Sequence, residues 1–362
     1  MNPLAKVNQL GQSIWLDFFD REMMNSGMLQ RMLDEDKITG ITSNPSIFEN
    51  ALYSGTDYDE DVKTLSADYS DPEELFFKFA VKDIRRATDI MRPIYDATQG
   101  NDGFVSLEVS PFLANDEEGT VRQAMQLWEE VDRENVMIKI PSTVEGLRAI
   151  RRVTAEGVNV NVTLLFGLER YREVVEAYIA GLEDRLAAGK PIDKVRSVAS
   201  FFLSRIDVLL DPQLKEKGLD HLVGEIAVAN ARTSYQIYKE LFGSERFKKL
   251  QASGGVAQRL LWASTGTKDP AYSDVKYVDT LIGENTVNTI PIDTLNAFRD
   301  HGTPAITIEE DIEKAAAQLK ELKDNGFDME AISQHLEEDG VEKFNVSFRN
   351  LLKAVEEKMK SV

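Results

Sequence analysis

The sequence predicts a closed (β/α)₈ barrel, also called a TIM barrel, followed by a C-terminal helical extension. Eight short β-rich runs alternate with longer segments in which apolar residues recur at helical spacing. Such alternation is typical of parallel strands joined by helices. An open doubly wound sheet is the main alternative, but no Gly-x-Gly-x-x-Gly follows a strand candidate, so the usual sign of a dinucleotide-binding fold is missing. We expect the barrel to form a catalytic domain over residues 1–305 and the extension to pack on it over residues 306–362.

The strand candidates are runs of apolar and β-branched residues that end at polar or turn-forming positions. In chain order they are residues 13–17, 38–43, 104–109, 136–141, 158–164, 195–203, 259–264 and 277–281. The fourth run is apolar except for Lys139, a pattern expected of a strand buried on both faces. Each run is therefore assigned to one strand of the barrel.

Several segments between the strands have the ends and the spacing of helices. Asp71 is a candidate N-cap, and it is followed by Pro72 and two acidic residues that suit the first turn of a helix. Apolar residues then recur at helical spacing as far as Pro93, where we expect this helix to stop. Two more helices are expected from Leu168 to Leu186 and from Leu219 to Phe242.

The composition becomes charged and helical from about Thr307. One amphipathic helix is expected from Ile308 to Leu322 and another from Phe344 to Met359, while Gly326 and Gly340 interrupt the region. We expect these helices to cover the outside or one end of the barrel. A dimerisation surface is the alternative, so the chain is expected to be a monomer or a homodimer.

The chain of 362 residues is acidic, with a formal net charge of −20. A field of this sign repels nucleic acid and anionic membranes, so neither is expected as a partner. It also repels phosphorylated metabolites unless the binding site supplies cations of its own. An anionic substrate therefore requires a local basic pocket.

The chain has no cysteine and only three histidines, His221, His301 and His335. Disulfides, thiolate catalysis and cysteine-ligated metals are excluded, and no two histidines are close enough in sequence for a local metal-binding motif. We expect neither a metal nor a cofactor. The first residues lack the pattern of a signal peptide, and no apolar stretch of about 18 residues occurs, so we expect a cytoplasmic protein.

Lys139 is the most unusual residue, because it lies inside the apolar run of the fourth strand. A buried ammonium group needs a partner or must lose its proton. Burial that lowers a lysine pKa from about 10.4 to about 7–8 raises the neutral fraction near pH 7 several hundredfold. The neutral amine is a nucleophile that condenses with a carbonyl group to form a Schiff base. A structural ion pair with Glu108 or Asp17 is the alternative that the pattern leaves open.

Polar residues stand near the carboxyl ends of several strands, where barrel enzymes place their chemistry. Asp17 and Glu108 are candidate proton carriers, and Thr163 could hold the water that imine formation releases. Asn44 and Asn161 could bind substrate hydroxyls without adding charge. The remaining candidates are Ser200, Arg205 and Lys268.

Several of these residues have a structural alternative. Asp17 could cap a strand end or form a turn. Asn161 and Thr163 could be core polar residues with satisfied hydrogen bonds. Arg205 could form a surface ion pair with Asp207.

Four motifs in the same order resemble those of transaldolases. They are residues 42–46 (Thr-Ser-Asn-Pro-Ser), 137–143 (Met-Ile-Lys-Ile-Pro-Ser-Thr), 161–166 (Asn-Val-Thr-Leu-Leu-Phe) and 200–207 (Ser-Phe-Phe-Leu-Ser-Arg-Ile-Asp). Residues 262–268 and 285–289 resemble the longer bacterial branch of the family. The resemblance extends from Asp17 to Pro291, which is most of the chain.

The resemblance implies a metal-free, class I Schiff-base mechanism in the pentose phosphate pathway. Members of the family transfer a dihydroxyacetone unit from a ketose phosphate, sedoheptulose 7-phosphate or fructose 6-phosphate, to an aldose phosphate, glyceraldehyde 3-phosphate or erythrose 4-phosphate. Two alternatives stay open. One is a class I aldolase that releases dihydroxyacetone, and the other is a barrel that binds sugar phosphates without catalysis.

The resemblance also implies a role for each candidate residue. Lys139 would form the Schiff base, Asp17 would carry the hydroxyl proton during carbon–carbon cleavage, and Glu108 would act through a water near Thr163. The implied substrate-binding residues are Asn44 and Asn161 for donor hydroxyls, Ser200 and Arg205 for the phosphate, and Phe202 for the pocket wall. Many transaldolases have an arginine where this chain has Lys268, which keeps the charge but loses the bidentate fork.

Overall fold

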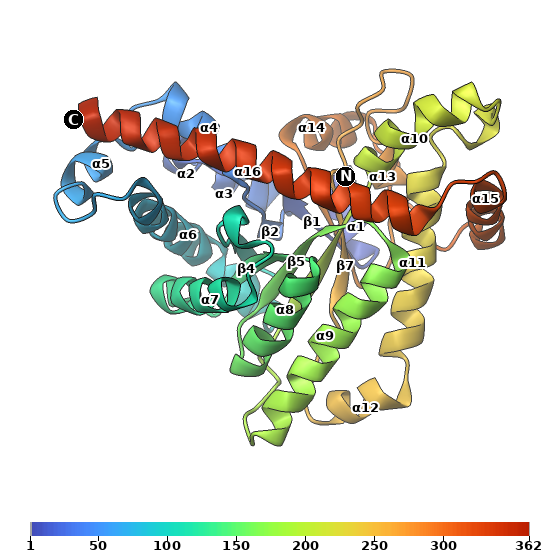
Figure 1. Cartoon of the computed structure of the whole chain (residues 1–362), viewed down its shortest axis with the longest axis horizontal. Helices are drawn as coiled ribbons and strands as arrows, with labels where there is room; N and C mark the ends of the chain where they lie inside the picture. Colours follow the sequence, from blue (N-terminus) through green and yellow to red (C-terminus); the bar gives the residue numbers. More distant parts are fainter. Residues whose placement is uncertain (1, 362) are drawn as a thin grey trace.

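Eight parallel strands form the centre of the computed structural model, which describes residues 2–361 (Figure 1). Each strand pairs with the next along the chain, and β8 pairs with β1, which closes the sheet. The strands are β1 (Gln12–Leu16), β2 (Gly40–Ile41), β3 (Phe104–Glu108), β4 (Val136–Pro141), β5 (Val160–Leu165), β6 (Ser197–Phe202), β7 (Arg259–Ala263) and β8 (Thr286–Ile290). This arrangement confirms the predicted (β/α)₈ barrel.

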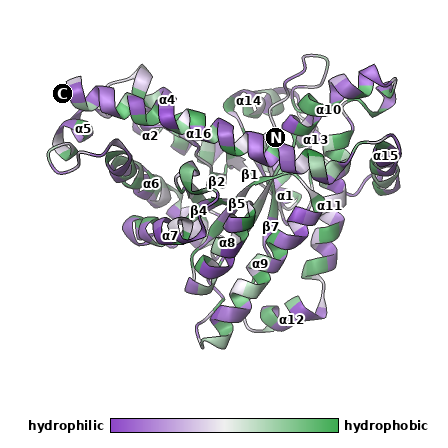
Figure 2. Cartoon of the chain, in the orientation of Figure 1, coloured by the Kyte–Doolittle hydropathy of each residue, from purple (hydrophilic) through white to green (hydrophobic). Residues whose placement is uncertain are grey.

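Helices connect the strands and surround the sheet. In the first half of the chain they are α1 (Pro3–Gln9), α2 (Arg21–Asn25), α3 (Met28–Arg31), η1 (Met32–Asp36), α4 (Pro45–Ser54), α5 (Asp59–Leu65), α6 (Pro72–Ala97), η2 (Pro111–Leu113), α7 (Glu117–Val131), α8 (Val144–Glu156) and α9 (Leu168–Ala187). In the second half they are α10 (Ser204–Glu216), η3 (Asp220–Leu222), α11 (Ile226–Phe242), α12 (Glu245–Ala252), α13 (Lys276–Asp279), α14 (Ile292–His301), α15 (Ile312–Asp324) and α16 (Met329–Ser361). Hydrophobic and hydrophilic residues alternate along α8, α9 and α16 (Figure 2), as expected of helices that cover a core.

No helix within residues 2–361 is both long and apolar enough to cross a membrane.

The last strand lies at a different place from the one predicted. Residues 277–281 were expected to form it, but Lys276–Asp279 is the short helix α13, and β8 follows at Thr286–Ile290. The polar residues of β8 are buried and hydrogen-bonded: Gln12 donates to the Thr286 hydroxyl at 3.0 Å, and Asn288 donates to the Tyr277 carbonyl at 3.0 Å. Because these partners come from other elements, the polar sequence of β8 did not reveal a buried strand.

Two helix boundaries also differ from the prediction. Helix α6 continues through Pro93 to Ala97, because its last turns pack on the barrel, with the ring of Tyr95 5.5 Å from that of Phe104. This packing outweighs the one backbone hydrogen bond that a proline removes. The predicted helix from Leu219 to Phe242 is divided, and α11 begins only at Ile226.

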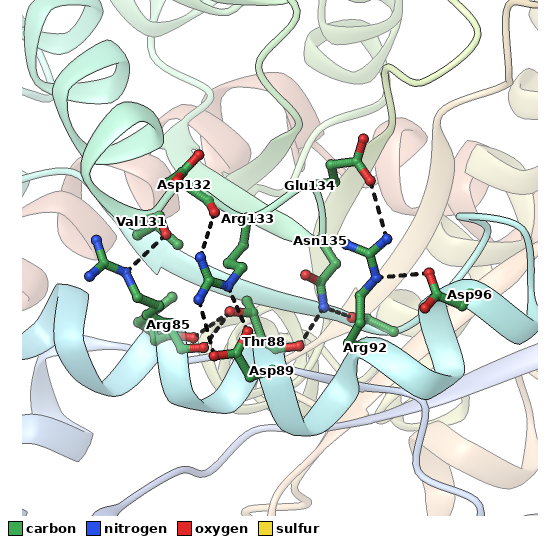
Figure 3. A network of polar contacts seen from close by, with 12 residues as sticks. Arg85, Thr88, Asp89, Arg92, Asp96, Val131, Asp132, Arg133, Glu134 and Asn135 are labelled. Carbon is green, nitrogen blue, oxygen red and sulfur yellow. Dashed lines mark hydrogen bonds and ion pairs between the residues drawn. The ribbon is translucent and has the colours of Figure 1, made fainter.

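The start of β4 is tied to α6 by a polar network (Figure 3). The amide of Asn135 donates to the carbonyls of Thr88 and Gly103, both at 2.9 Å. Arg133 forms an ion pair with Asp89 of α6 at 2.6 Å. These contacts fix where the strand enters the barrel, and they therefore help to position the side chains that follow along β4.

The C-terminal helix α16 crosses the molecule from α15 toward α4 and α5 (red in Figure 1). It contacts α4, α5, α6, η2 and the strand β5. The expected interruption at Gly340 is wrong, because α16 runs unbroken from Met329 to Ser361. Gly340 lies close to the barrel, because a Cβ atom there would be 2.9 Å from Leu164 Cδ2. The division of the chain at residues 305 and 306 stays a prediction.

Candidate active site

A pocket opens at the carboxyl ends of the strands, and most of the predicted site residues line it. These residues are Asp17, Asn44, Lys139, Thr163, Ser200, Phe202 and Arg205. Thr42, Thr289 and Phe344 line the same pocket and were not predicted as site residues. A smaller cavity beside it is lined by Glu108, Lys139 and Thr163.

Lys139 lies on the pocket side of β4, between Glu108 of β3 and Asn161 of β5 in the register of the sheet. Its side chain is 7% exposed, and its ammonium group forms an ion pair with the Glu108 carboxylate. The same ammonium donates to the Ser43 carbonyl at 2.8 Å. The ion pair that the sequence left open is therefore present, and it lies inside the pocket rather than in a closed core.

Glu108 is largely buried beside this ammonium. Burial raises the pKa of Glu108, and the nearby Lys139 charge acts in the opposite direction. The negative charge of Asp17 raises the pKa further. A carboxylate with a raised pKa that contacts an ammonium group is well suited to accept its proton.

Asp17 follows β1 and reaches the opposite side of the same pocket. Burial raises the pKa of Asp17, whereas the charge of Lys139 and hydrogen bonds from Thr42 and Asn44 lower it. The Thr42 hydroxyl is 2.9 Å from Asp17 Oδ1 and 2.7 Å from the Thr289 hydroxyl. The carboxylate of Asp17 is thus held by Thr42 and Asn44, which follow β2, and Thr289 of β8 in turn contacts the Thr42 hydroxyl.

Thr163 offers a hydroxyl group with no hydrogen-bond partner among residues 2–361, although it is buried. It stands where β5 is irregular, because the pairing with β6 shifts between Val162 and Leu165. Leu164 has a φ of 58°, a left-handed conformation that a branched residue rarely adopts. A free buried hydroxyl beside Lys139 and Glu108 is suited to bind a small polar molecule such as water.

Asn161 does not line the pocket but lies beneath it, fully buried. Its amide donates to the Ser106 hydroxyl at 3.0 Å and accepts from Ser200 at 2.6 Å. In this structure Asn161 is therefore a buried polar residue whose side chain forms hydrogen bonds within the core. Ser200 does reach the pocket lining, and its hydroxyl is held by that hydrogen bond.

Arg205 brings a positive charge to the pocket without a neutralising partner. Its Nη1 atom is buried and has no hydrogen-bond partner, and no carboxylate within residues 2–361 lies within 4.0 Å of the guanidinium. Burial lowers the pKa of Arg205, and the charge of Asp339 acts against this. The alternative prediction, a surface ion pair between Arg205 and Asp207, is wrong, because Asp207 is bound by Lys276 and Tyr277. An unpaired guanidinium in a pocket indicates an anion site.

Lys268 also does not line the main pocket. It is exposed and lines a neighbouring groove with Lys215 and Tyr272. Its charge nevertheless lowers the pKa of Asp17. Within residues 2–361, no group of three or more His, Asp or Glu side chains is arranged to hold a metal ion.

Thr42, Thr289 and Phe344, three of the lining residues that were not predicted, differ in how clearly the sequence indicated them. Thr42 lies inside one of the motifs, but its hydroxyl was given no role in the site. Thr289 would have been found if β8 had been assigned correctly, because it stands near the end of that strand. Phe344 belongs to the apolar stripe of α16, and such a stripe does not distinguish a pocket wall from core packing.

Comparison with known proteins gives one consistent result. A family model described as Transaldolase/Fructose-6-phosphate aldolase matches residues 14–355. A transaldolase from Saccharopolyspora erythraea is 48% identical over 361 residues, which cover 98% of this chain and 97% of the relative. A transaldolase from Trichodesmium erythraeum is 45% identical over 374 residues, covering 100% and 98% of the two chains. One from Thiobacillus denitrificans is 44% identical over 355 residues, covering 97% and 99%.

Proposed function

Because the chain belongs to the transaldolase/fructose-6-phosphate aldolase family, we propose that Lys139 forms the Schiff base through which it transfers a dihydroxyacetone unit. The enzyme is a transaldolase, a transferase that acts on sugar phosphates in the pentose phosphate pathway. The observation that carries the proposal is the contact of the Lys139 ammonium with Glu108 inside a pocket that Asp17 also lines. The donors are sedoheptulose 7-phosphate and fructose 6-phosphate, and the acceptors are glyceraldehyde 3-phosphate and erythrose 4-phosphate.

The first step makes the amine of Lys139 nucleophilic. Glu108 accepts a proton from the ammonium along their direct contact, and the neutral amine attacks the C2 carbonyl of the ketose. The resulting carbinolamine loses its hydroxyl group as water, with the proton supplied by Glu108, and an iminium ion forms. The free hydroxyl of Thr163 binds the departing water, which returns when the imine is hydrolysed.

The second step breaks the bond between C3 and C4 of the donor. Asp17 takes the proton of the C4 hydroxyl as this group becomes an aldehyde, and the bonding electrons move into the iminium to give an enamine. The aldose phosphate leaves, and the enamine remains bound to Lys139. The reverse steps with a new aldehyde form the product, and Asp17 returns its proton.

The remaining residues bind the substrate. Arg205 holds the phosphate, because its buried Nη1 atom has no hydrogen-bond partner among residues 2–361, and Asn44 binds donor hydroxyls. Phe202 forms an apolar wall of the pocket. Asn161, with Ser200 bound to it, supports the floor of the site. Lys268 adds positive charge near the entrance, which helps an acidic protein to attract an anionic sugar.

Covalent trapping tests this proposal directly. Borohydride reduction of the protein in the presence of fructose 6-phosphate, followed by peptide mass mapping, is expected to add mass to the peptide that contains Lys139. A sugar-phosphate-binding barrel without catalysis gives no adduct under conditions in which binding is demonstrated. An adduct on a different lysine would also contradict the assignment.

Product analysis separates transfer from simple aldol cleavage. The same residues form the enamine in both reactions, so the difference is whether the enamine meets an aldehyde or is protonated and released as dihydroxyacetone. We expect a ketose phosphate product when glyceraldehyde 3-phosphate is supplied, and little dihydroxyacetone without it. Dihydroxyacetone release at the same rate with and without the acceptor would favour the aldolase.

Arg205→Ala is expected to raise the KM for fructose 6-phosphate by roughly 10- to 100-fold, the value of one or two charge-assisted hydrogen bonds. The kcat should change much less, because the phosphate is bound in the ground state and in the transition state alike. The free energy of unfolding should also change little, since no carboxylate in residues 2–361 loses an ion-pair partner. Steady-state kinetics with fructose 6-phosphate measures the effect, and an unchanged KM removes Arg205 from this role.

As the pH is lowered, the rate of transfer is expected to fall at a higher pH than it would if the carboxyl groups had ordinary pKa values. Burial raises the pKa of both Asp17 and Glu108 against the opposing charge of Lys139. Both groups must be ionised to accept a proton, so activity is lost as the pH falls through these raised values. A pH profile of kcat/KM measures the position of the acid limb. A limb at or below the usual carboxyl range would contradict the proton-carrier roles.

The cellular setting is also proposed. The net charge of −20, the lack of cysteine and the absence of a membrane-crossing helix within residues 2–361 support a cytoplasmic location. The chain acts as a monomer or a homodimer. Size-exclusion chromatography with light scattering would distinguish these two states.

A further inference from the structure

The C-terminal helix α16 supplies part of the wall of the pocket. Phe344 lines both the main pocket and the smaller cavity beside it, and Val341 lines the smaller cavity. Both residues belong to the segment in which only structural helices were expected. The pocket is therefore completed by a helix from outside the strand–loop regions that usually form the site of a barrel enzyme.

Phe344 contacts Arg205, the residue to which we assign phosphate binding. The guanidinium carbon of Arg205 is 5.5 Å from the ring centre of Phe202 and 6.0 Å from that of Phe344. Both distances are within the range at which a cation is attracted to an aromatic ring. Phe202 is the last residue of β6, three positions before Arg205, whereas Phe344 approaches the guanidinium from α16. Two aromatic rings from two different elements therefore contact the guanidinium.

Gly340 allows α16 to come this close. A Cβ atom at this position would be 2.9 Å from Leu164 Cδ2 and 3.3 Å from Arg205 Nη1. Glycine is a poor helix former, and its presence in the middle of a long helix needs a reason in the packing. One helical turn separates it from Phe344, so the glycine and the aromatic ring face the same guanidinium.

The site of Arg205 has little else to hold the side chain in place. Asp339 is the only charged group that affects the pKa of Arg205, and Nη1 has no hydrogen-bond partner within residues 2–361. A long, flexible side chain without hydrogen-bond partners is held by packing alone. Removing one of the two aromatic contacts should therefore leave the guanidinium free to turn away from the pocket.

We propose that Phe344 determines specificity for phosphorylated sugars by positioning Arg205 at the phosphate, with Gly340 setting the distance of α16. The proposal rests on the proposed function only for the identity of the substrate, because the positioning of Arg205 is a property of the empty pocket. Its consequence is that the C-terminal helix selects substrates as well as covering the barrel.

The decisive variant is Phe344→Leu, which keeps an apolar side chain and removes the aromatic face. We expect it to raise the KM for fructose 6-phosphate about fivefold, the effect of losing one partly buried cation–π contact. The kcat and the KM for unphosphorylated fructose should change less than the KM for fructose 6-phosphate, so the ratio of the two donor KM values should change. Phe344→Tyr keeps the aromatic face and should restore a KM near that of the wild type.

A matched control comes from the next turn of the same helix. Phe348 is buried in an aromatic cluster with Phe76 and Phe77 and does not line the pocket. Phe348→Leu should lower the melting temperature while leaving the ratio of the two donor KM values unchanged. If Phe344→Leu and Phe348→Leu change this ratio equally, the proposal is wrong.

Calorimetric titration of the full-length protein with inorganic phosphate separates this proposal from the proposed function. Phosphate affinity should fall in Phe344→Leu and in Gly340→Ala, in which the new methyl group displaces the guanidinium, and not in Phe348→Leu. If the variants show this pattern of phosphate affinities but the wild type has no transfer activity, the proposed function fails and the positioning role stands. If transfer is observed but all variants bind phosphate equally, the positioning role fails alone.

Discussion

Lys139→Ala is expected to reduce the kcat for transfer by on the order of 10⁴-fold or more, because the covalent intermediate can no longer form. No other amine occupies this position, since Lys139 is the lysine that lines the pocket within residues 2–361. Borohydride should then trap no fructose 6-phosphate on the protein. Activity close to that of the wild type would refute the assignment of the nucleophile.

The stability of this variant needs its own control. Removing Lys139 leaves Glu108 buried without its counter-charge, and breaking a buried pair costs about 3–5 kcal/mol when the remaining charge persists. The double variant Lys139→Ala, Glu108→Gln removes that charge. We expect its free energy of unfolding to recover relative to the single variant while transfer stays abolished. Circular dichroism during thermal unfolding separates a lost nucleophile from a lost fold.

Asp17→Asn is expected to reduce transfer by about 10²- to 10⁴-fold, the usual contribution of a general base. The amide keeps the shape of the carboxylate and still accepts the hydrogen bond that Thr42 donates at 2.9 Å. Imine formation does not use Asp17, so borohydride should still trap intact fructose 6-phosphate on Lys139. This separation of trapping from turnover is the specific signature of a residue that acts in carbon–carbon cleavage.

Asp20→Asn is the matched control for this second variant. Asp20 lies three positions further along the chain and accepts from the Met23 backbone amide at 2.7 Å, at the start of α2. It does not line the pocket, so the transfer rate should stay near that of the wild type. If Asp17→Asn prevents trapping as well as turnover, Asp17 does not act in the cleavage step alone.

The main elements of the site could be predicted because their sequence signals are local. A lysine in an apolar strand is conspicuous, and parallel strands bring their carboxyl ends to one edge of the barrel. Asp17, Glu108 and Thr163 therefore lie around Lys139 as the order of strands predicts. The first seven strand candidates overlap observed strands for the same reason, since each is recognisable from its own run of apolar and β-branched residues.

The misplaced features depend on contacts that are distant in sequence. The polar residues of β8 are buried only because Gln12 and Tyr277 satisfy them, so the segment does not have the apolar pattern of a strand. Gly340 was expected to interrupt a helix, and its close approach to Leu164 cannot be inferred from α16 alone. The role of Asn161 in substrate binding stays a prediction, and its hydrogen bonds with Ser106 of β3 and Ser200 of β6 could not be inferred from β5 alone.

Closure of the sheet has a consequence for the newborn chain on the ribosome. Gln12 of β1 meets Thr286 of β8, and 274 positions separate them in the sequence. Until β8 has been synthesised, β1 and β7 each present an unpaired edge, which favours association with other chains. Thr289, which holds Thr42 beside Asp17, arrives at the same moment. Protection against aggregation and completion of the proton-carrying group are therefore reached together, late in translation.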